Sequence, residues 1–281
     1  MRAIVLVPDP GFGEAWDWAY NVEAAALERG GIAPIARPWT EAGAFDADIV
    51  LPLVAWGYHA DPSRWHALLD RLEFDGATVA NPVSALRWNS DKKYLIELER
   101  NGVATIPTRF VEALDAAAIA DAQRDLGADL VIKPPVSAAA DGIYRIGADD
   151  DIPASALGQP TMIQPFLPSV MNEGEYSILM FDGKFSHAVV KRPKSGDYRV
   201  QPHLGGQEQP CTPPDGAIAL AEAALAVAPE PVAYARVDMV RGSDGALKVI
   251  ELELIEPSLW LEHAPDGGAS FVAAILRRAR P

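Results

Sequence analysis

The feature of the sequence that most constrains the fold is a pair of alternating segments near the C-terminus. Apolar and polar residues alternate over 237–240 and again over 249–253, and an Asp-Gly turn pair lies between the two runs. Two such runs joined by a turn predict a β-hairpin, in which every second side chain points to the same face. The hairpin would therefore carry Asp238, Glu251 and Glu253 on one face.

Three carboxylates on one face repel one another unless a cation neutralises them. Hard oxygen ligands in this number suit Mg²⁺ or Mn²⁺. The alternative is an edge hairpin with a hydrated acidic face. The hairpin alone therefore leaves two interpretations open, a divalent metal site and a solvated acidic surface.

The first part of the chain, about 80 residues, alternates strand-like and helix-like segments, which is typical of a small parallel α/β unit. We expect strands over 3–7, 32–37, 48–54 and 77–80, and helices over 15–29 and 62–72. Gly11 and Gly13 follow the first strand, but Trp16 stands where a dinucleotide-binding loop requires a third glycine. That class of nucleotide site is therefore not predicted here.

Two lysines stand at the expected start of a helix that ends before Gly102. Asn89 or Ser90 is a suitable N-cap, which places Lys92 and Lys93 at the positive end of the helix dipole. A cation is disfavoured at that end unless an anion binds there too. The lysines indicate either an anion site or two hydrated surface side chains.

Three further segments have the composition of an anion or nucleotide site. Lys133 ends an expected strand and precedes a small-residue loop over 136–142, whose backbone a phosphate could approach closely, although an ordinary hairpin loop would look the same. The extended segment 161–168 could offer backbone groups to an adenine edge. Basic residues over 191–199 follow a predicted hairpin and suggest anion binding or a solvated turn.

Composition excludes several classes of function. The formal net charge of −15, with no basic stripe, argues against a protein that binds the nucleic-acid backbone. The single cysteine, Cys211, cannot form an internal disulfide, and its Pro-rich surroundings offer no general base for a nucleophile. No apolar stretch approaches the length of about twenty residues that spans a membrane, and the N-terminus does not resemble a signal peptide. We expect a cytoplasmic protein.

The order of these motifs is more specific than any one of them. The motifs are Asp91-Lys92, Ile132-Lys133, Ile163–Leu167, Gly174–Ser177, His187–Lys191, Gly196–Arg199, Arg236–Asp238 and Glu251–Glu253. This order resembles the ATP-grasp superfamily, in its glutathione-synthetase-like and RimK-like branch. The segments Trp88–Lys92 and Ile250–Leu259 are similar to the cycloserine-biosynthesis ligase group.

The resemblance implies an α/β protein, α+β in its ATP-binding half, with the ATP-grasp fold and an N-terminal parallel α/β domain. The implied domains are an N-terminal domain over 1–84, a small lid-bearing subdomain over 85–160 and a C-terminal subdomain with the metal site over 161–281.

The resemblance also implies a role for each matching residue. The phosphates of ATP would be bound by Lys92 or Lys93, by Lys133 and, at the γ-phosphate, by Lys191. Adenine would be held by Gln164 and the backbone near Phe166 and Leu167, and the ribose by Glu175. Arg236 would stabilise the transferring phosphoryl group, Arg199 would orient a substrate carboxylate, and two Mg²⁺ ions (or Mn²⁺) would be held by Asp238, Glu251 and Glu253.

Two positions depart from the usual pattern of the superfamily. Glu253 stands where an asparagine is usual, although a carboxylate still suits Mg²⁺. Alanines occupy much of the loop 137–142, where glycines are usual, and they restrict its backbone.

The implied activity is an ATP-dependent carboxylate–amine ligase that forms a carbon–nitrogen bond through an acyl phosphate and releases ADP and phosphate. Its partners would be a small amino-acid-like carboxylate and a nitrogen nucleophile, with no nucleic acid and no membrane, and homo-oligomers occur among related enzymes. A non-catalytic ATP-binding regulator and a small-molecule kinase with a stable phosphorylated product are the alternatives.

Overall fold

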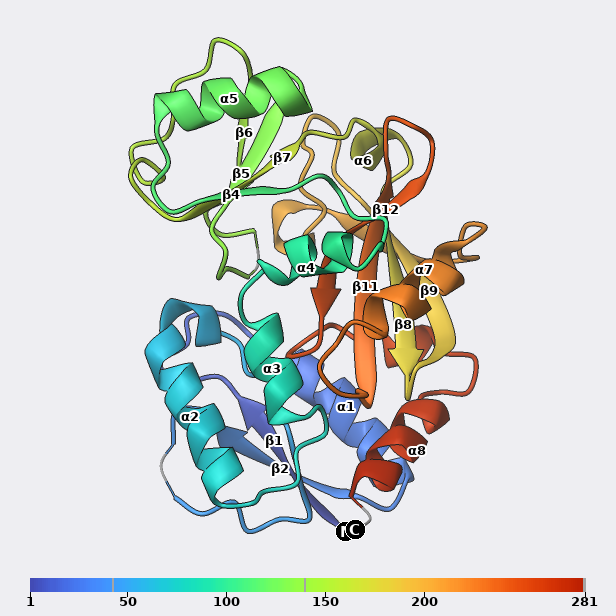
Figure 1. Ribbon diagram of the computed structural model, residues 1–281. Coiled ribbons are helices and arrows are strands. Elements are labelled where there is room, and N and C mark those ends of the chain that lie inside the picture. The colour runs from blue at the N-terminus through green and yellow to red at the C-terminus, as the bar shows by residue number, and fades with distance from the viewer. Residues whose placement is uncertain (42, 139, 280–281) are drawn as a thin grey trace.

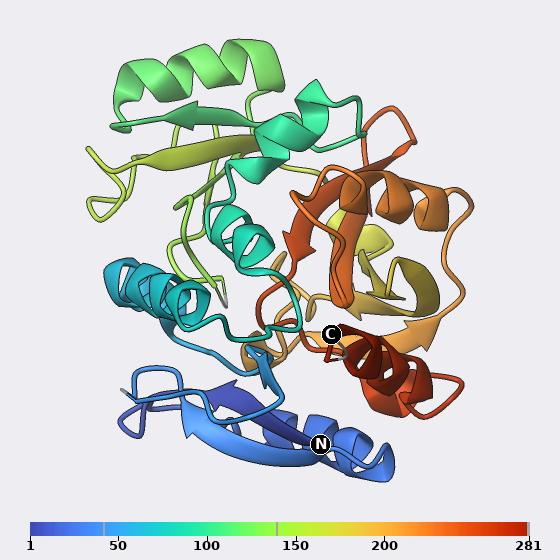
Figure 2. The same ribbon diagram turned by 60° about the horizontal axis from the view of Figure 1, so that its bottom comes forward.

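The computed structural model describes residues 1–41, 43–138 and 140–279, and it contains three β-sheets with helices packed on them (Figure 1). Helices α3 (Val83–Asn89) and α4 (Tyr94–Arg100) lie between the sheets in both views (Figures 1 and 2). Within the described ranges, none of the helices combines the length and apolar character needed to cross a membrane.

The N-terminal sheet is parallel, with strand order β2-β1-β3. Its elements are β1 (Arg2–Val7), α1 (Asp17–Arg29), β2 (Ala33–Pro38), β3 (Ile49–Leu51) and α2 (Pro62–Phe74). The predicted parallel α/β unit is confirmed. The strand expected over 77–80 is wrong, because Val79 forms only a single bridge with Val50 before Pro82, which lacks an amide hydrogen, follows.

The second sheet is antiparallel, with strand order β4-β7-β5-β6, and α5 lies across it (Figure 1). Its elements are β4 (Arg109–Val111), α5 (Ala116–Leu126), β5 (Leu130–Lys133), β6 (Tyr144–Ile146) and β7 (Thr161–Pro165). Asp115 caps α5 by accepting a hydrogen bond from the amide of Ala118 at 2.7 Å, which fixes where the helix begins.

The third sheet is antiparallel, with strand order β10-β9-β8-β11-β12. Its elements are α6 (Ser169–Asn172), β8 (Glu175–Phe181), β9 (Lys184–Arg192), β10 (Gln207–Cys211), α7 (Ala217–Leu225), β11 (Tyr234–Arg241) and β12 (Leu247–Glu253). The predicted hairpin is confirmed as β11–β12. Cys211 lies at the end of β10 rather than in a loop, since Gln207–Cys211 pairs with β9 despite Pro210. Proline is tolerated there because β10 is an edge strand.

The segment between the first two sheets contains two short helices, α3 (Val83–Asn89) and α4 (Tyr94–Arg100). The expectation that Asn89 or Ser90 caps α4 is wrong, because Asn89 ends α3. Its buried side chain instead donates to the carbonyl of Leu252 at 2.7 Å and accepts from the amide of Leu254 at 2.8 Å. β12 is an edge strand, so its exposed backbone groups need partners, and Asn89 supplies two of them.

The C-terminal helix α8 (Ala269–Arg278) joins the N-terminal sheet to the third sheet. The aromatic ring of Phe271 lies 5.5 Å from that of Phe181 and 6.4 Å from that of Tyr234, measured between centroids. The sequence predicts a C-terminal helix over about 269–280, and the helix is confirmed to Arg278, whereas Arg280 lies outside the described residues. The three sheets are consistent with three predicted domains, whose boundaries at 84 and 160 remain a prediction.

Candidate active site

The register of the β11–β12 hairpin brings the three predicted carboxylates together. Asp238 pairs with Glu251 across the two strands, and Arg236 pairs with Glu253. One carboxylate oxygen from each of Asp238, Glu251 and Glu253 lies within 4.8 Å of the others. Asp238 has no exposed surface, because β11 is an interior strand, whereas the side chains of Glu251 and Glu253 are 30% and 24% exposed. A fully solvated acidic face is therefore excluded.

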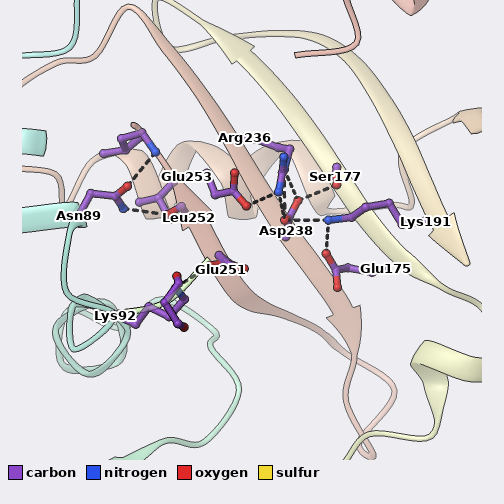
Figure 3. A network of polar contacts seen from close by, with 12 residues as sticks. Asn89, Lys92, Glu175, Ser177, Lys191, Arg236, Asp238, Glu251, Leu252 and Glu253 are labelled. Atoms are coloured by element: carbon purple, nitrogen blue, oxygen red, sulfur yellow. Dashed lines mark hydrogen bonds and ion pairs between the residues drawn. The ribbon is translucent and has the colours of Figure 1, made fainter. Parts of the chain in front are cut away.

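The cluster includes its own cations (Figure 3). The guanidinium of Arg236 donates to Asp238 at 2.9 and 3.0 Å and also to Glu253. The ammonium of Lys191 lies 2.9 Å from Asp238 and also contacts Glu175, its partner across the β8–β9 pair. Ion pairs inside the protein therefore compensate much of the acidic charge.

Burial and ion pairing act in opposite directions on the carboxyl groups of this cluster. Burial alone would raise the pKa of Asp238, but Arg236 and Lys191 outweigh it and hold that pKa well below its usual range. Burial raises the pKa of Glu253 to about 8 and that of Glu175 to about 7, against the opposing effects of Arg236 and Lys191. The cluster therefore favours added positive charge, either as protons or as a metal ion.

The structure separates the two neighbouring lysines. The ammonium of Lys92 lies 3.2 Å from Glu251 and donates to the carbonyl of Ser137. That of Lys93 instead pairs with Asp91 at 3.1 Å and lies 4.6 Å from the ring centre of Phe110. Of the two, only Lys92 belongs to the cluster.

Lys133, the last residue of β5, is also buried beside the cluster. Burial lowers the pKa of its ammonium to about 8, although Glu251 opposes the shift. The loop that follows holds Ala140 at a φ of +62°, a region where glycine is usual. Ala139, part of the predicted phosphate loop, lies outside the described residues.

The segment predicted to hold adenine follows β7. Gln164 is buried and donates to the hydroxyl of Thr108 at 2.9 Å. The amide of Phe166 donates to the carbonyl of Asp129 at 2.8 Å, so that amide is already engaged. Leu167 is half-buried. An adenine edge would have to use other backbone groups of this segment.

Arg199 is not brought to the cluster by any hydrogen bond or ion pair among the described residues. Its guanidinium pairs with Asp197 at 3.0 Å on the loop after β9, and hydrogen bonds from Arg199 hold the pKa of Asp197 far below its usual range. A role at the reacting groups would require this loop to bring Arg199 closer.

Two residues of the site were missed by the sequence-based prediction. Ser177 donates from its hydroxyl to Asp238 at 2.6 Å. Ser177 lies two residues after Glu175 and therefore on the same face of β8, so the sequence could have predicted its place at the site. Trp260 lies under the guanidinium of Arg236, 5.2 Å from ring centre to Cζ, and its indole donates to Glu208 at 2.9 Å. Trp260 has a φ of +42°, which local sequence does not indicate.

Comparisons with known proteins agree with the resemblance. A family model described as the ATP-grasp domain of prokaryotic glutathione synthetase matches residues 101–230. The chain is 34% identical to the cycloserine biosynthesis protein DcsG of Streptomyces lavendulae over 72% of this chain and 74% of that protein. It is 33% identical to the glutathione synthetase of Prochlorococcus marinus (strain MIT 9313) over 51% of this chain and 46% of that one.

Among solved structures, D-cycloserine synthetase DcsG aligns with 99% of both chains at a TM-score of 0.86 and 28% identity. This structural match extends over all three sheets, and the sequence match to DcsG covers about three quarters of each chain. The chain therefore belongs to the ATP-grasp ligases, ATP-dependent enzymes that form carbon–nitrogen bonds.

Proposed function

We propose that this ligase activates a small amino-acid-like carboxylate as an acyl phosphate and joins it to a nitrogen nucleophile, releasing ADP and phosphate. The observation that carries the proposal is the convergence of Asp238, Glu251 and Glu253 with three buried cations: Arg236 on the same hairpin, Lys191 on β9 and Lys92 before α4. Carboxylates that suit a divalent ion and cations that suit phosphates are neighbours here, so a metal–ATP complex bound at this place would meet both groups.

The proposed metal ligands fit Mg²⁺, because all three are carboxylates and two of them are partly open to solvent. Together Asp238, Glu251 and Glu253 would hold two ions. Bound there, Mg²⁺ would offset the negative charge of the ATP phosphates.

The remaining assignments concern ATP and the substrate. Lys92, Lys133 and Lys191 would bind phosphates, with Lys92 preferred to Lys93 because of its position at Glu251. Gln164, the backbone beside Phe166 and Leu167, and Glu175 would hold the nucleoside. Arg199 would reach the substrate carboxylate after its loop moves.

The proposed reaction has two steps. An oxygen of the substrate carboxylate attacks the γ-phosphorus of ATP, and the bond to the ADP oxygen breaks. Arg236, held in place by Asp238 and Glu253, would stabilise the charge on the transferring group. The nitrogen nucleophile then attacks the acyl carbon and loses a proton, and the carbon–oxygen bond to phosphate breaks.

An ADP-release screen over pairs of carboxylates and amines tests this proposal, with hydroxylamine as a general trap for acyl phosphates. Glu251→Gln should abolish ADP release, whereas Glu99→Gln, at an exposed position on α4, should leave it unchanged. Release of AMP and pyrophosphate would refute the mechanism. A stable phosphorylated product without ligation, identified by mass spectrometry, would also contradict it.

A further inference from the structure

A small hollow lies between α1 and the segment that follows β12, outside the carboxylate cluster. Its volume is about 30 Å³, which is room for roughly two water molecules or one ammonium group. Among its described lining residues there are three carboxyl groups and three indole rings but no Lys, Arg or His. These are Glu23, Glu256, Glu262, Trp18, Trp56 and Trp260.

Glu23 is the unusual member of this set. It lies in the middle of α1 with only 4% of its surface exposed, and its Oε2 atom has no hydrogen-bond partner in the described structure. A buried carboxyl group without a partner is costly, so its place in a helix that could carry an apolar residue there needs an explanation. Burial raises the pKa of this carboxyl well above its usual value, and a bound cation would restore the charged form.

The rest of the wall also favours a cation. The rings of Trp18 and Trp56 lie 5.7 Å apart, and the faces of indole rings attract ammonium groups. Trp18 is 55% exposed and forms the rim, whereas Trp260 is almost fully buried. A second carboxyl group, that of Glu256, is half-buried in the same wall.

The hollow shares a wall with the active site. Trp260 lines the hollow and also lies against the guanidinium of Arg236, which contacts Asp238 and Glu253. An ammonium group in the hollow would therefore be separated from Arg236 by the side chain of Trp260.

We infer that this hollow binds the ammonium group of an amine-bearing substrate, with Glu23 as its charged partner and Trp18, Trp56 and Trp260 as its aromatic wall. The inference rests on the proposed ligase function, because it names the chemical class of one substrate of that reaction. The bound class is a small primary amine or amino acid; the corresponding alcohols and hydroxy acids are excluded.

Binding can be measured without turnover, since three tryptophans line the hollow. Ethylammonium chloride, D-alanine and L-alanine are titrated against the full chain while tryptophan fluorescence is followed, with ethanol, lactate and sodium chloride as matched controls. Ethylammonium and at least one alanine enantiomer should give a saturable change that the controls do not give. An equal response to ethanol and lactate would overturn the inference.

Single substitutions test whether the fluorescence change comes from binding in the hollow. Glu23→Gln should weaken ethylammonium binding about tenfold or more, because it replaces an ion pair with the ammonium group by a hydrogen bond to an uncharged amide. Glu28→Gln, on the exposed face of the same helix, should bind as the parent does. Trp18→Ala, at the exposed rim, should weaken binding severalfold and does not endanger folding. Unchanged binding in both Glu23→Gln and Trp18→Ala would refute the assignment.

The ligase assay separates this inference from the proposed function. With an active substrate pair, Glu23→Gln should raise KM for the amine-bearing substrate and leave KM for ATP unchanged. If ADP is released but KM for the amine does not change, the hollow is not the amine site while the ligase function stands. If no pair releases ADP yet Glu23-dependent ammonium binding persists, the proposed reaction fails and the hollow stands as a cation site.

Discussion

The side chain of Asn89 connects the fold to the active site, and replacing it should damage both. Asn89 forms hydrogen bonds with the backbone of Leu252 and Leu254, the two neighbours of Glu253, which is the last residue of β12. In Asn89→Ala the carbonyl of Leu252 keeps a partner, because the hydroxyl of Tyr94 also donates to it at 2.9 Å. The amide of Leu254, which is fully buried, loses its acceptor.

The expected loss of stability in Asn89→Ala follows from the two hydrogen bonds that are lost. Leaving the buried amide of Leu254 without an acceptor costs about 1–3 kcal/mol of stability. Losing one of the two hydrogen bonds to the carbonyl of Leu252 costs about 1 kcal/mol more. The sum of about 2–4 kcal/mol should lower the melting temperature by roughly 3–7 °C in a chain of this size. The matched control is Asn101→Ala, which removes an exposed side-chain bond to the carbonyl of Glu97 and should change stability by less than about 0.5 kcal/mol.

The assay is thermal unfolding followed by circular dichroism, combined with the Mg²⁺ dependence of ADP release. Because Glu251 and Glu253 lie on the strand that Asn89 holds, Asn89→Ala should require a higher Mg²⁺ concentration for half-maximal activity. Equal melting temperatures for Asn89→Ala and Asn101→Ala would refute the reasoning, since they would mean that solvent or another group satisfies the edge of β12.

Further predictions concern the charges of the site. Ser177→Ala removes a donor to Asp238, so the pKa of Asp238 should rise and Mn²⁺ affinity, measured by titration calorimetry, should fall about tenfold; unchanged affinity would contradict this. Phosphates favour the charged form of Lys133, whose pKa is lowered to about 8, so nucleotide affinity should weaken as the pH rises through about 8. Lys133→Arg, which stays charged, should flatten that dependence, and a parallel decline in both proteins would refute the assignment.

Local patterns in the sequence predicted the hairpin and the carboxylates on its face. Strand alternation has a period of two, so Asp238 could be placed on one face of β11, and Glu251 and Glu253 on one face of β12, without knowledge of any other part of the fold. The same reasoning gave the parallel N-terminal unit. The pairing of Asp238 with Glu251 was not predicted, because the register shifts between Asp238 and Met239, and this irregularity decides which residue of β12 lies opposite Asp238.

Contacts between distant segments could not be predicted in this way. Asn89 looked like a helix cap because its local sequence fits one, but the unpaired edge of β12, more than 160 residues further along the chain, determines where its side chain bonds. No strand was predicted over Gln207–Cys211, which contains Pro210, yet this segment pairs with the free edge of β9. Trp260 and Glu23 carried no local signal, because their importance depends on which groups the fold places beside them.

Charge compensation shows why three carboxylates alone were an incomplete argument for a metal. Repulsion among them was taken to require an added cation, but Arg236, Lys191 and Lys92 already pair with them. The chemistry of these partners still favours a metal site. Arginine and lysine are the side chains that bind phosphate best, so the same cations suit the phosphates of a metal–ATP complex. If bound phosphates drew Lys191 and Lys92 away from the carboxylates, as the proposed function implies, the carboxylates would again need a divalent ion to neutralise them. ATP and the metal ion should therefore bind cooperatively, so that each raises the affinity of the site for the other.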